Sequence, residues 1–409
     1  MDSEKTLVLI SAAFPLGGVT EQAFIQPEIE ALASAFDRVI ILPLSEETGK
    51  TEIPALPENV TVDRSLLGTP SAGKKLSLFF HPSVALHIPG DLPYMRKPGH
   101  LRQAVAESVY ATFYRHRLEK WIRDNRIPLS RTLFYTFWFN YATNALAGIH
   151  NARIVTRAHG YDIFDYTPNL ISHSWRRDTL REILACFPAS EHGARYLRNQ
   201  YLESGSKIRA RRLGCTAPTG LNPDAGDDCP LTLLSCARLA PVKGVLRQIR
   251  FVKEWARRNP GIKVRWICIG HGAERPLIEK EILDLPENLE AEMMGELPNS
   301  DVRKLLQTRH IDLMILLSHS EGCPIAPCEA ISCGVPILCT DAGGSREIAN
   351  SLTGKLLPLN PSADEFCAAV DALRPRLAQL RESARQFWEM NFDSGKLRRD
   401  FARELAAML

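Results

Sequence analysis

The stretch that decides the fold is Leu313-Met-Ile-Leu-Leu-Ser-His-Ser-Glu321-Gly-Cys-Pro-Ile-Ala-Pro-Cys-Glu329-Ala-Ile-Ser-Cys-Gly334-Val-Pro-Ile-Leu-Cys339. Its two apolar runs, 313–317 and 335–339, have the length and composition of buried strands. Prolines at 324 and 327 suit the start of a helix between these runs. Two strands joined through one helix form the repeating unit of a parallel sheet that helices cover on both faces. The stretch therefore predicts an open α/β fold.

The same alternation of apolar runs and amphipathic segments extends through the 409-residue chain, whose length suits two domains. In the first half we expect strands at 7–12, 39–43, 132–137, 153–158 and 185–189. In the second half we expect them at 231–235, 264–269, 313–317 and 335–339. The segment 214–230 between the halves is rich in Gly, Pro and Asp and is typical of a linker. We therefore predict α/β domains at 1–213 and 231–386, a linker at 214–230, and an amphipathic C-terminal segment at 387–409.

Composition is that of a globular protein, with 45% apolar and 24% charged residues. A net charge of +3 gives no indication of a nucleic-acid partner. No apolar run reaches the roughly 18 residues of a membrane span. We interpret the early run Leu7–Phe14 as a first buried strand rather than a signal peptide, because no cationic segment precedes it.

The ten cysteines all lie from Cys186 onward. Four of them, Cys323, Cys328, Cys333 and Cys339, are spaced without a CxxC motif, and no histidine follows at ligand spacing. We therefore expect reduced cysteines packed as small hydrophobic side chains, and no metal site. No Asp-x-Asp flanked by strand signals offers itself as a metal-binding centre either.

Two carboxylates of the opening stretch, Glu321 and Glu329, are the leading candidates for a binding site. Glu321 lies in the loop after a strand, and Glu329 in the first turns of the next helix. Ligands bind open α/β sheets at this edge, and a helix N-terminus there offers N–H groups to an anion. Each carboxylate could accept hydrogen bonds from a pair of vicinal hydroxyls, worth about 1.5–3 kcal/mol each. The alternatives are an acid/base pair of a glycosidase and two unrelated surface acids.

Cationic and glycine-containing loops follow two other expected strands of the second half. Arg238, Lys243 and Gly244 come after the strand 231–235, and a guanidinium with an ammonium at a strand end suits a diphosphate. Gly270-His-Gly272 follows the strand 264–269 and would let a ligand approach the backbone. Taken alone, the pair Arg238 and Lys243 favours an ordinary surface turn. The G-x-G-x-x-G dinucleotide fingerprint is absent.

The first half contributes two loops to the same kind of edge. Gly17 and Gly18 follow the first strand. His159 directly follows the strand 153–158 and precedes a glycine, a position more exposed to a cleft than that of a core histidine. A purely structural histidine is the alternative.

Together these residues resemble the large family-four group of retaining glycosyltransferases, which have the GT-B fold. The resemblance is strongest over 231–357, through Arg238 with Lys243-Gly244, Gly270-His-Gly272, Gly295-Glu-Leu-Pro-Asn299, Glu321 with Glu329, Gly334-Val-Pro336 and Gly343-Gly344. The first half resembles the family more loosely, and residues 45–130 match no motif. The resemblance implies two Rossmann-like domains facing across a cleft, with 387–409 packing back on the first.

The resemblance also implies roles for the site residues. Arg238 and Lys243 would bind the diphosphate of a sugar nucleotide, and Glu329 its ribose. Glu321 would bind the donor sugar, helped by the backbone of Gly322, Cys323, Pro324 and Ile325. Gly17, Gly18, Gly270 and Gly272 would lie along the donor, and His159 would hold or stabilise its sugar at the transition state. Cys323 and Cys328 depart from the commoner pattern, and we interpret them as tuning the pocket.

The implied function is metal-independent transfer of a hexosyl group, with retention, from a nucleoside-diphosphate sugar to a saccharide or lipid-linked acceptor. Polysaccharide, lipopolysaccharide or glycolipid biosynthesis in the bacterial cytoplasm is the expected setting. The basic, aromatic region 70–131 is either a solvated insertion or a contact with the cytoplasmic face of the inner membrane. Rival interpretations are a sugar-nucleotide epimerase or hydrolase on the same fold, and a non-catalytic sugar-nucleotide-binding protein.

Overall fold

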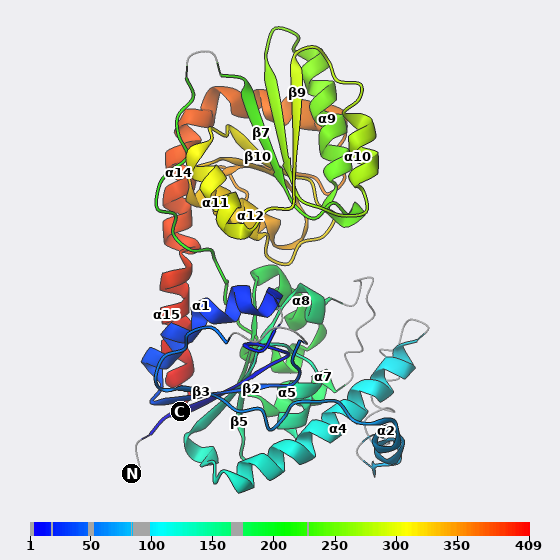
Figure 1. Ribbon diagram of the computed structural model, residues 1–409, viewed down its shortest axis with the longest axis vertical. Helices are drawn as coiled ribbons and strands as arrows, with labels where there is room; N and C mark the ends of the chain where they lie inside the picture. The colour runs from blue at the N-terminus through cyan, green and yellow to red at the C-terminus, as the bar shows by residue number, and fades with distance from the viewer. Residues whose placement is uncertain are drawn as a thin grey trace. The chain divides into compact units, whose positions relative to one another are not determined.

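The computed structural model describes residues 4–17, 19–47, 53–82, 84, 99–164, 175–226 and 229–409. Its contacts divide the chain into two compact units (Figure 1). Unit 1 comprises Met1–Arg212 with Lys396–Leu409, and unit 2 comprises Leu213–Gly395. Each unit is built around one parallel sheet.

The sheet of unit 1 has the strand order β3-β2-β1-β4-β5-β6. Every neighbouring pair is parallel, and the order 3-2-1-4-5-6 is that of a Rossmann domain. The strands are β1 (Thr6–Ser11), β2 (Arg38–Pro43), β3 (Val60–Val62), β4 (Thr132–Thr136), β5 (Arg153–Ala158) and β6 (Ala185–Pro188).

Helices cover both faces of this sheet, and residues of each strand alternate between two cores. Val8, for example, belongs to the core under α4, α5, α7 and α8, whereas Leu7 belongs to the core under α1 and α15. The helical elements of unit 1 are α1 (Val19–Ala35), α2 (Ala72–Phe79), α4 (His100–Asp124), η2 (Leu129–Arg131), α5 (Tyr141–Ala147), α6 (Gly160–Ile163), α7 (Arg176–Glu182), α8 (Glu191–Gln200), η3 (Leu202–Lys207) and α15 (Ser394–Ala406).

Unit 2 repeats the architecture with the all-parallel order β12-β11-β10-β7-β8-β9. Its strands are β7 (Leu231–Cys236), β8 (Val264–Ile269), β9 (Leu289–Gly295), β10 (Leu313–Leu316), β11 (Ile337–Thr340) and β12 (Gly354–Leu357). The opening stretch of the sequence forms β10, α12 (Ile325–Ser332) and β11, as predicted.

The helices of unit 2 pack on both faces of its sheet and form one hydrophobic core on each face. α9 (Val245–Arg258), α10 (Arg275–Glu281) and α13 (Ala363–Leu373) cover one face, and α11 (Asn299–Thr308), α12 and α14 (Leu377–Asn391) cover the other (Figure 1). Short turns η4 (Pro241–Lys243), η5 (Gly343–Glu347) and η6 (Arg374–Arg376) complete the unit. The predicted fold class is confirmed by these two parallel sheets.

The boundaries of the units differ from the expected ones because the linker packs on unit 2. The side-chain amide of Asn222 is buried and donates to the carbonyl oxygens of Leu306 (2.6 Å) and Arg309 (2.8 Å). Cys215 exchanges backbone hydrogen bonds of 3.1 Å with Phe392 and Ser394. Unit 2 therefore begins at Leu213, so the change of unit falls before the expected linker 214–230.

In the C-terminal segment, the chain returns to unit 1 at Lys396, later than the expected residue 387. Residues 387–391 continue α14 and belong to unit 2, where Trp388 lies in the core. Only Lys396–Leu409 returns to unit 1, where Phe401 and Leu405 of α15 are buried. Among the described residues, no helix is long and apolar enough to cross a bilayer.

Candidate active site

The loops at the carboxyl edge of the second sheet pack backbone to backbone, and glycines make this possible. A Cβ at Gly244 would lie 2.1 Å from the carbonyl oxygen of Leu317, and a Cβ at Gly343 would lie 2.0 Å from that of Glu321. Both glycines have positive φ, +62° and +55°. The loops after β7, β10 and β11 are thereby held together around Glu321.

Gly270 and Gly272 hold the loop after β8 against the loop after β7 in the same way. Their added Cβ atoms would lie 1.9 Å from the oxygen of Ala237 and 2.3 Å from that of Leu239. The Leu239 N–H also donates to the His271 carbonyl at 2.9 Å. Both glycines therefore position the loop that carries Arg238 and Lys243.

Lys243 and Glu321 form an ion pair at this edge. The Lys243 ammonium lies 2.7 and 2.8 Å from the two carboxylate oxygens of Glu321. The hydroxyl of Ser318 donates to the same carboxylate at 2.6 Å. The Glu321 side chain is 6% exposed and that of Lys243 is 25% exposed, so the ammonium lies on the outer side of the pair. Ser318 was not singled out in the sequence, where it is one polar residue of a polar loop.

Glu329 lies in α12 and is buried beside Asn299, the first residue of α11. The Asn299 amide donates to the Glu329 carboxylate at 2.7 Å. Burial raises the pKa of Glu329, and the Asn299 hydrogen bond and the charge of Arg303 oppose that shift. A raised pKa marks a carboxylate that lacks water, a common property of ligand-binding groups.

The segment between Glu321 and Glu329 has the expected form. α12 begins at Ile325 with Pro324 as its N-cap. Gly322, Cys323 and Ile325 are half-buried. Their N–H groups are donors to an anion, whereas Pro324 has no N–H and can contribute only shape.

Arg238 is exposed just after β7. No hydrogen bond or ion pair joins its guanidinium to another residue that the structure describes. Its position beside Leu239, on the loop that carries Lys243, leaves it available to an anionic ligand.

In unit 1, the loop after β1 is organised by Glu21, a residue that the sequence analysis missed. The buried Glu21 carboxylate accepts hydrogen bonds from the N–H groups of Ala12 (2.7 Å), Ala13 (2.6 Å) and Phe14 (2.9 Å). It also accepts one from the indole of Trp138 (2.6 Å). An acid in the first turn of α1 looks like any favourable helix-start residue, so no sequence signal distinguishes it.

Gly17 and Gly18 were predicted to lie in the loop after β1. Gly17 has φ +152° and faces Glu47, whose Cβ lies 2.7 Å from where a Gly17 Cβ would be. Gly18 lies outside the described residues.

His159 directly follows β5, and its ring lies beside two aromatic rings. Its ring centroid lies 4.6 Å from that of Phe137 and 4.7 Å from that of Trp138. Both ring nitrogens are buried without a hydrogen-bond partner among the described residues. Burial and the charge of Arg157 lower the pKa of His159 to about 3. The imidazole is therefore neutral, and it has two polar atoms that a ligand could satisfy.

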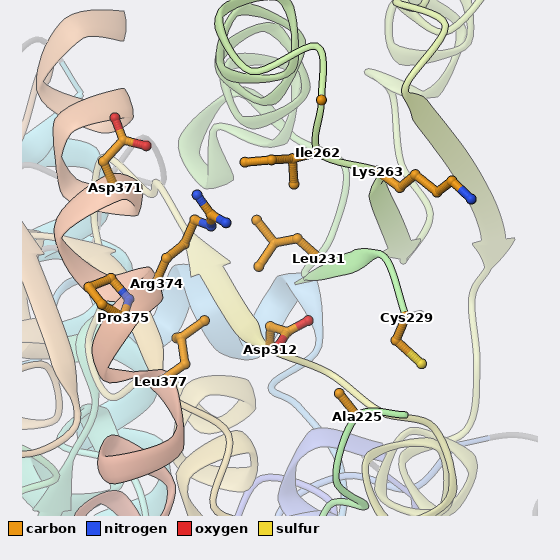
Figure 2. Close-up of a pocket in the computed structure, with 11 residues that line it drawn as sticks. Ala225, Cys229, Leu231, Ile262, Lys263, Asp312, Asp371, Arg374, Pro375 and Leu377 are labelled. Carbon is orange, nitrogen blue, oxygen red and sulfur yellow. The ribbon is translucent and has the colours of Figure 1, made fainter. Parts of the chain in front are cut away.

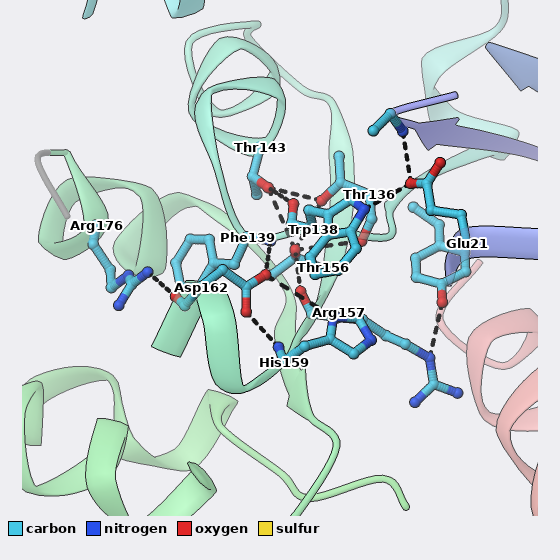
Figure 3. A network of polar contacts seen from close by, with 12 residues as sticks. Glu21, Thr136, Trp138, Phe139, Thr143, Thr156, Arg157, His159, Asp162 and Arg176 are labelled. Carbon is cyan, nitrogen blue, oxygen red and sulfur yellow. Dashed lines mark hydrogen bonds and ion pairs between the residues drawn. The ribbon is translucent and has the colours of Figure 1, made fainter. Parts of the chain in front are cut away.

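Asp162 fixes the backbone around His159. Its carboxylate accepts hydrogen bonds from the N–H groups of His159 and, at 2.8 Å, of Phe139 (Figure 3). Burial raises the pKa of Asp162 to about 7, against these hydrogen bonds and the charge of Arg176.

Arg157 belongs to a buried network on the other side of β5. It donates to Glu28 at 2.7 Å and to the Tyr135 hydroxyl at 2.9 Å, and its guanidinium lies 4.1 Å from the ring centroid of Phe401. A charge this deep needs such partners. Arg157 therefore stabilises the strand end that presents His159 and the docking of α15.

The cysteines show no metal centre or disulfide. All ten are free thiols, seven of them buried, and no group of three or more His, Cys, Asp or Glu side chains suits a metal among the described residues. Cys229 differs from the expectation because it is exposed. Burial holds the pKa of Cys328 well above its usual range, so this thiol beside Glu329 is unreactive.

A cavity of about 840 Å³ in unit 2 lies at the opposite edge of the sheet (Figure 2). Leu231 begins β7, Lys263 precedes β8 and Asp312 precedes β10, so its walls come from the amino ends of the strands. No predicted site residue lines it. Its size alone does not make it the active site, because open α/β sheets bind ligands at the carboxyl edge.

Comparison with known proteins agrees with this geometry. Residues 225–386 match the family model described as "Glycosyl transferases group 1". Among curated proteins, the amylovoran biosynthesis glycosyltransferase AmsK of Erwinia amylovora is 25% identical over 297 residues, 65% of this chain and 67% of the relative. A D-inositol 3-phosphate glycosyltransferase of Rhodococcus erythropolis is 26% identical over 201 residues, 48% of this chain and 45% of the relative.

Among solved structures, the lipopolysaccharide outer core galactosyltransferase WaaB in its apo form aligns with a TM-score of 0.68 and 15% identity. That alignment covers 99% of this chain and 100% of the WaaB chain. The chain spans about two thirds or less of the length of the curated relatives that it matches.

The two parallel sheets and the alignment with WaaB thus show the GT-B fold. Residues 225–386 of unit 2 carry the match to the family Glycosyl transferases group 1. The resemblance drawn from the sequence is confirmed.

Proposed function

We propose that the chain transfers a hexosyl group, with retention of anomeric configuration, from a nucleoside-diphosphate sugar to an acceptor hydroxyl. The observation that carries this proposal is the Lys243–Glu321 ion pair. Glu329 lies in α12, the helix that directly follows the loop of Glu321. A cation and two carboxylates at one sheet edge match the three parts of a sugar nucleotide. These are the diphosphate, the sugar hydroxyls and the ribose hydroxyls.

In this mechanism the diphosphate is the leaving group. The bond between the anomeric carbon and the phosphate oxygen breaks, and the diphosphate keeps the electron pair. The acceptor oxygen bonds to the anomeric carbon and passes its proton to the departing phosphate oxygen. Lys243, Arg238 and the N–H groups at the start of α12 would stabilise the charge that develops on the diphosphate.

The two carboxylates act as anchors rather than as an acid/base pair. Glu321 already holds Lys243, so a donor sugar that hydrogen-bonds to Glu321 would place its phosphate close to the ammonium. Glu329 would accept from the ribose hydroxyls while Asn299 keeps its carboxylate oriented. Neither role needs a proton transfer or a metal ion.

His159 would contribute from unit 1 as a neutral hydrogen-bonding group. Its ring nitrogens have no partner among the described residues, and its pKa of about 3 excludes a charged imidazole near neutral pH. We therefore assign it to holding the donor sugar by a hydrogen bond and not to electrostatic stabilisation.

A saccharide or lipid-linked acceptor in bacterial surface-polysaccharide or lipopolysaccharide assembly is the proposed setting. This proposal follows by analogy with the amylovoran relative. The cytoplasm, where sugar nucleotides are made, is the proposed location.

We also propose peripheral contact with the inner membrane through α2 and its end. Leu76, Phe79 and Phe80 are 64%, 47% and 75% exposed, and the neighbouring Lys74 and Lys75 are exposed too. Apolar side chains flanked by cations suit an anionic bilayer surface. Flotation with phosphatidylglycerol vesicles should carry the protein upward, and the double variant Phe79→Ser, Phe80→Ser should lose that flotation. Equal flotation of both proteins would exclude this surface.

The donor class is tested by a thermal-shift panel of UDP, GDP, ADP, CMP and dTDP. A ligand that binds the folded state raises the melting temperature by mass action, so one nucleotide should stand out. Incubation of the matching sugar nucleotides without acceptor separates the rival enzymes, because an epimerase would convert the donor. A non-catalytic binding protein would bind the nucleotide and transfer nothing.

A further inference from the structure

Glu21, in the first turn of α1, connects the loops that follow β1 and β4. Its buried carboxylate accepts three hydrogen bonds from backbone N–H groups of the loop after β1. A fourth, at 2.6 Å, comes from the indole N–H of Trp138, which follows β4 at the carboxyl edge of the sheet (Figure 3). Neither side chain has a part in the chemistry proposed for the donor.

Trp138 is one of the two aromatic side chains that pack on the ring of His159. The ring centroids of Trp138 and His159 lie 4.7 Å apart. The second ring is that of Phe137, at 4.6 Å, which is 1% exposed and belongs to a hydrophobic core of unit 1. Phe137 is therefore fixed by packing alone. Trp138 is only half-buried, so its position depends more on the hydrogen bond to Glu21.

The imidazole of His159 has no hydrogen bond of its own among the described residues. Both of its ring nitrogens are buried without a partner there. A carboxylate oxygen of Asp162 lies 4.0 Å from Nδ1, beyond hydrogen-bond distance, and Asp162 holds only the backbone N–H of His159. The two aromatic rings therefore set the direction in which the imidazole nitrogens point.

A second buried carboxylate on the same helix holds the strands behind these loops. Glu28 follows Glu21 by about two helical turns, so both side chains lie on one face of α1. Glu28 accepts hydrogen bonds from the Tyr135 hydroxyl at 2.9 Å and the Arg157 guanidinium at 2.7 Å. Tyr135 belongs to β4 and Arg157 to β5. α1 thus holds both strands through Glu28, and the indole that follows β4 through Glu21.

We propose that Glu21 is a positioning residue for the transfer reaction, which directs the imidazole of His159 toward the donor sugar through the indole of Trp138. The inference rests on the proposed transferase function and on the role given there to His159. A neutral imidazole acts through a directed hydrogen bond, and such a bond weakens steeply when its atoms are misaligned. A displacement of about 1 Å in an active site can cost about 10²-fold in rate.

A purely structural Glu21 would hold the loop after β1 and do nothing more. The two roles can be separated because they use different hydrogen-bond donors. Trp138→Phe removes the indole N–H, keeps an aromatic ring beside His159 and leaves the backbone donors to Glu21 in place. A structural role predicts a loss of stability with unchanged kinetics. A positioning role predicts a loss of rate that requires His159.

The first test is a double-mutant cycle on kcat/KM. It uses the full chain, the sugar nucleotide of the base found by thermal shift, and a panel of methyl glycosides as acceptors. Trp138→Phe should lower kcat/KM about tenfold in the otherwise unchanged protein and less than about twofold in the His159→Ala background, because its effect passes through His159.

Trp121→Phe is the matched control for this cycle. Trp121 lies in the same unit, is 4% exposed, and its indole N–H donates to the Asp63 carboxylate at 2.7 Å. The control therefore removes the same kind of hydrogen bond and ring volume away from His159. It should lower the urea midpoint of unfolding and leave kcat/KM within about twofold.

A second measurement needs no substrate. The eleven histidines are labelled with ¹³C at ring Cε1, and the His159 signal is identified by its absence in His159→Ala. Ring currents of the neighbouring aromatic rings make this signal sensitive to their geometry. Glu21→Gln keeps Trp138 but loses the carboxylate that holds it, so the His159 signal should move. The matched variant Asp63→Asn should leave that signal in place.

Equal rate losses from Trp138→Phe with and without His159, or an unmoved His159 signal in Glu21→Gln, would overturn the proposal. If Glu21→Gln does not fold, the cycle decides alone, because Trp138→Phe keeps Glu21. Product formation with either of these contrary results overturns this inference and leaves the transferase proposal standing. A moved His159 signal in a protein that transfers sugar from no sugar nucleotide overturns the transferase proposal instead.

Discussion

The ammonium of Lys243 lies within 2.8 Å of both carboxylate oxygens of Glu321, although the two residues are 78 positions apart in the sequence. One comes from the turn after β7 and the other from the loop after β10, and these strands are neighbours in the sheet. A bidentate pair at this edge ties a group proposed to bind the diphosphate to a group proposed to bind the sugar.

Removing either member of the pair should impair catalysis. Lys243→Ala and Glu321→Gln should each lower kcat/KM by about 10²-fold or more, as removal of a preorganised charged contact does in other enzymes. Steady-state kinetics with the donor identified by thermal shift measure the effect. Lys263→Ala is the matched control, because Lys263 is exposed at the opposite edge of the same sheet. Turnover of Lys243→Ala within about twofold of the unchanged protein would contradict the site.

Glu329 should confer recognition of the ribose. The unchanged protein should bind a ribonucleoside diphosphate more tightly than its 2′-deoxy analogue, because the carboxylate accepts from both ribose hydroxyls. Glu329→Gln should reduce that preference, which titration calorimetry with the two nucleotides measures. If the preference persisted undiminished in the variant, another residue would hold the ribose.

The glycines of the carboxyl edge should be intolerant of a side chain. Gly343→Ala would place a methyl group 2.0 Å from the Glu321 oxygen at φ +55°, so the free energy of unfolding should fall by more than about 2 kcal/mol. Gly261→Ala, with open space around its added Cβ, should change it by less than about 0.5 kcal/mol. Urea denaturation compares the two. Equal stability of both variants would mean that the loops are not packed as described.

His159 and Asp162 should make opposite contributions to the pH dependence of stability. The pKa of His159 falls from 6.5 to about 3 on folding, so its contribution is lost as pH falls below 6.5. The pKa of Asp162 rises from 3.8 to about 7, so its protonated form stabilises the fold at low pH, and that contribution is lost as pH rises through 7.

Between pH 4 and 6.5 the two contributions oppose each other, and single variants should expose them. Asp162→Asn leaves His159 alone, so the free energy of unfolding should rise with pH relative to His159→Asn, by up to about 1.4 kcal/mol per pH unit for each group. Urea denaturation of both variants across this range gives the difference. A difference that does not change with pH would show that neither group is buried as described.

Most strands, and the strand-end loops that carry the second-half candidate residues, were predictable because each depends on local sequence. Buried parallel strands are short apolar runs, and a strand followed by Gly, Pro and a charged residue marks a ligand edge. The three missed strands are weaker signals. β3 has three residues, β9 reads Leu-Glu-Ala-Glu-Met-Met-Gly at a sheet edge, and β12 begins with a glycine.

What the sequence could not supply are contacts between distant segments. Glu21 binds the loop that precedes its own helix, and Ser318 and Asn299 orient carboxylates. The hydrogen bonds of Asn222 to Leu306 and Arg309 attach the expected linker to unit 2. Each is a polar residue in an ordinary local context, and only the tertiary packing gives it a role.

The most direct test of the proposed function is the product itself. The sugar nucleotide of the responding base, incubated with a panel of methyl glycosides as acceptors, should yield a disaccharide and the free nucleoside diphosphate. Proton NMR of the new linkage should show the same anomeric configuration as the donor, and Lys243→Ala should form the product about 10²-fold more slowly. An inverted linkage, an epimerised donor, or equal rates for Lys243→Ala and the unchanged protein would contradict the account.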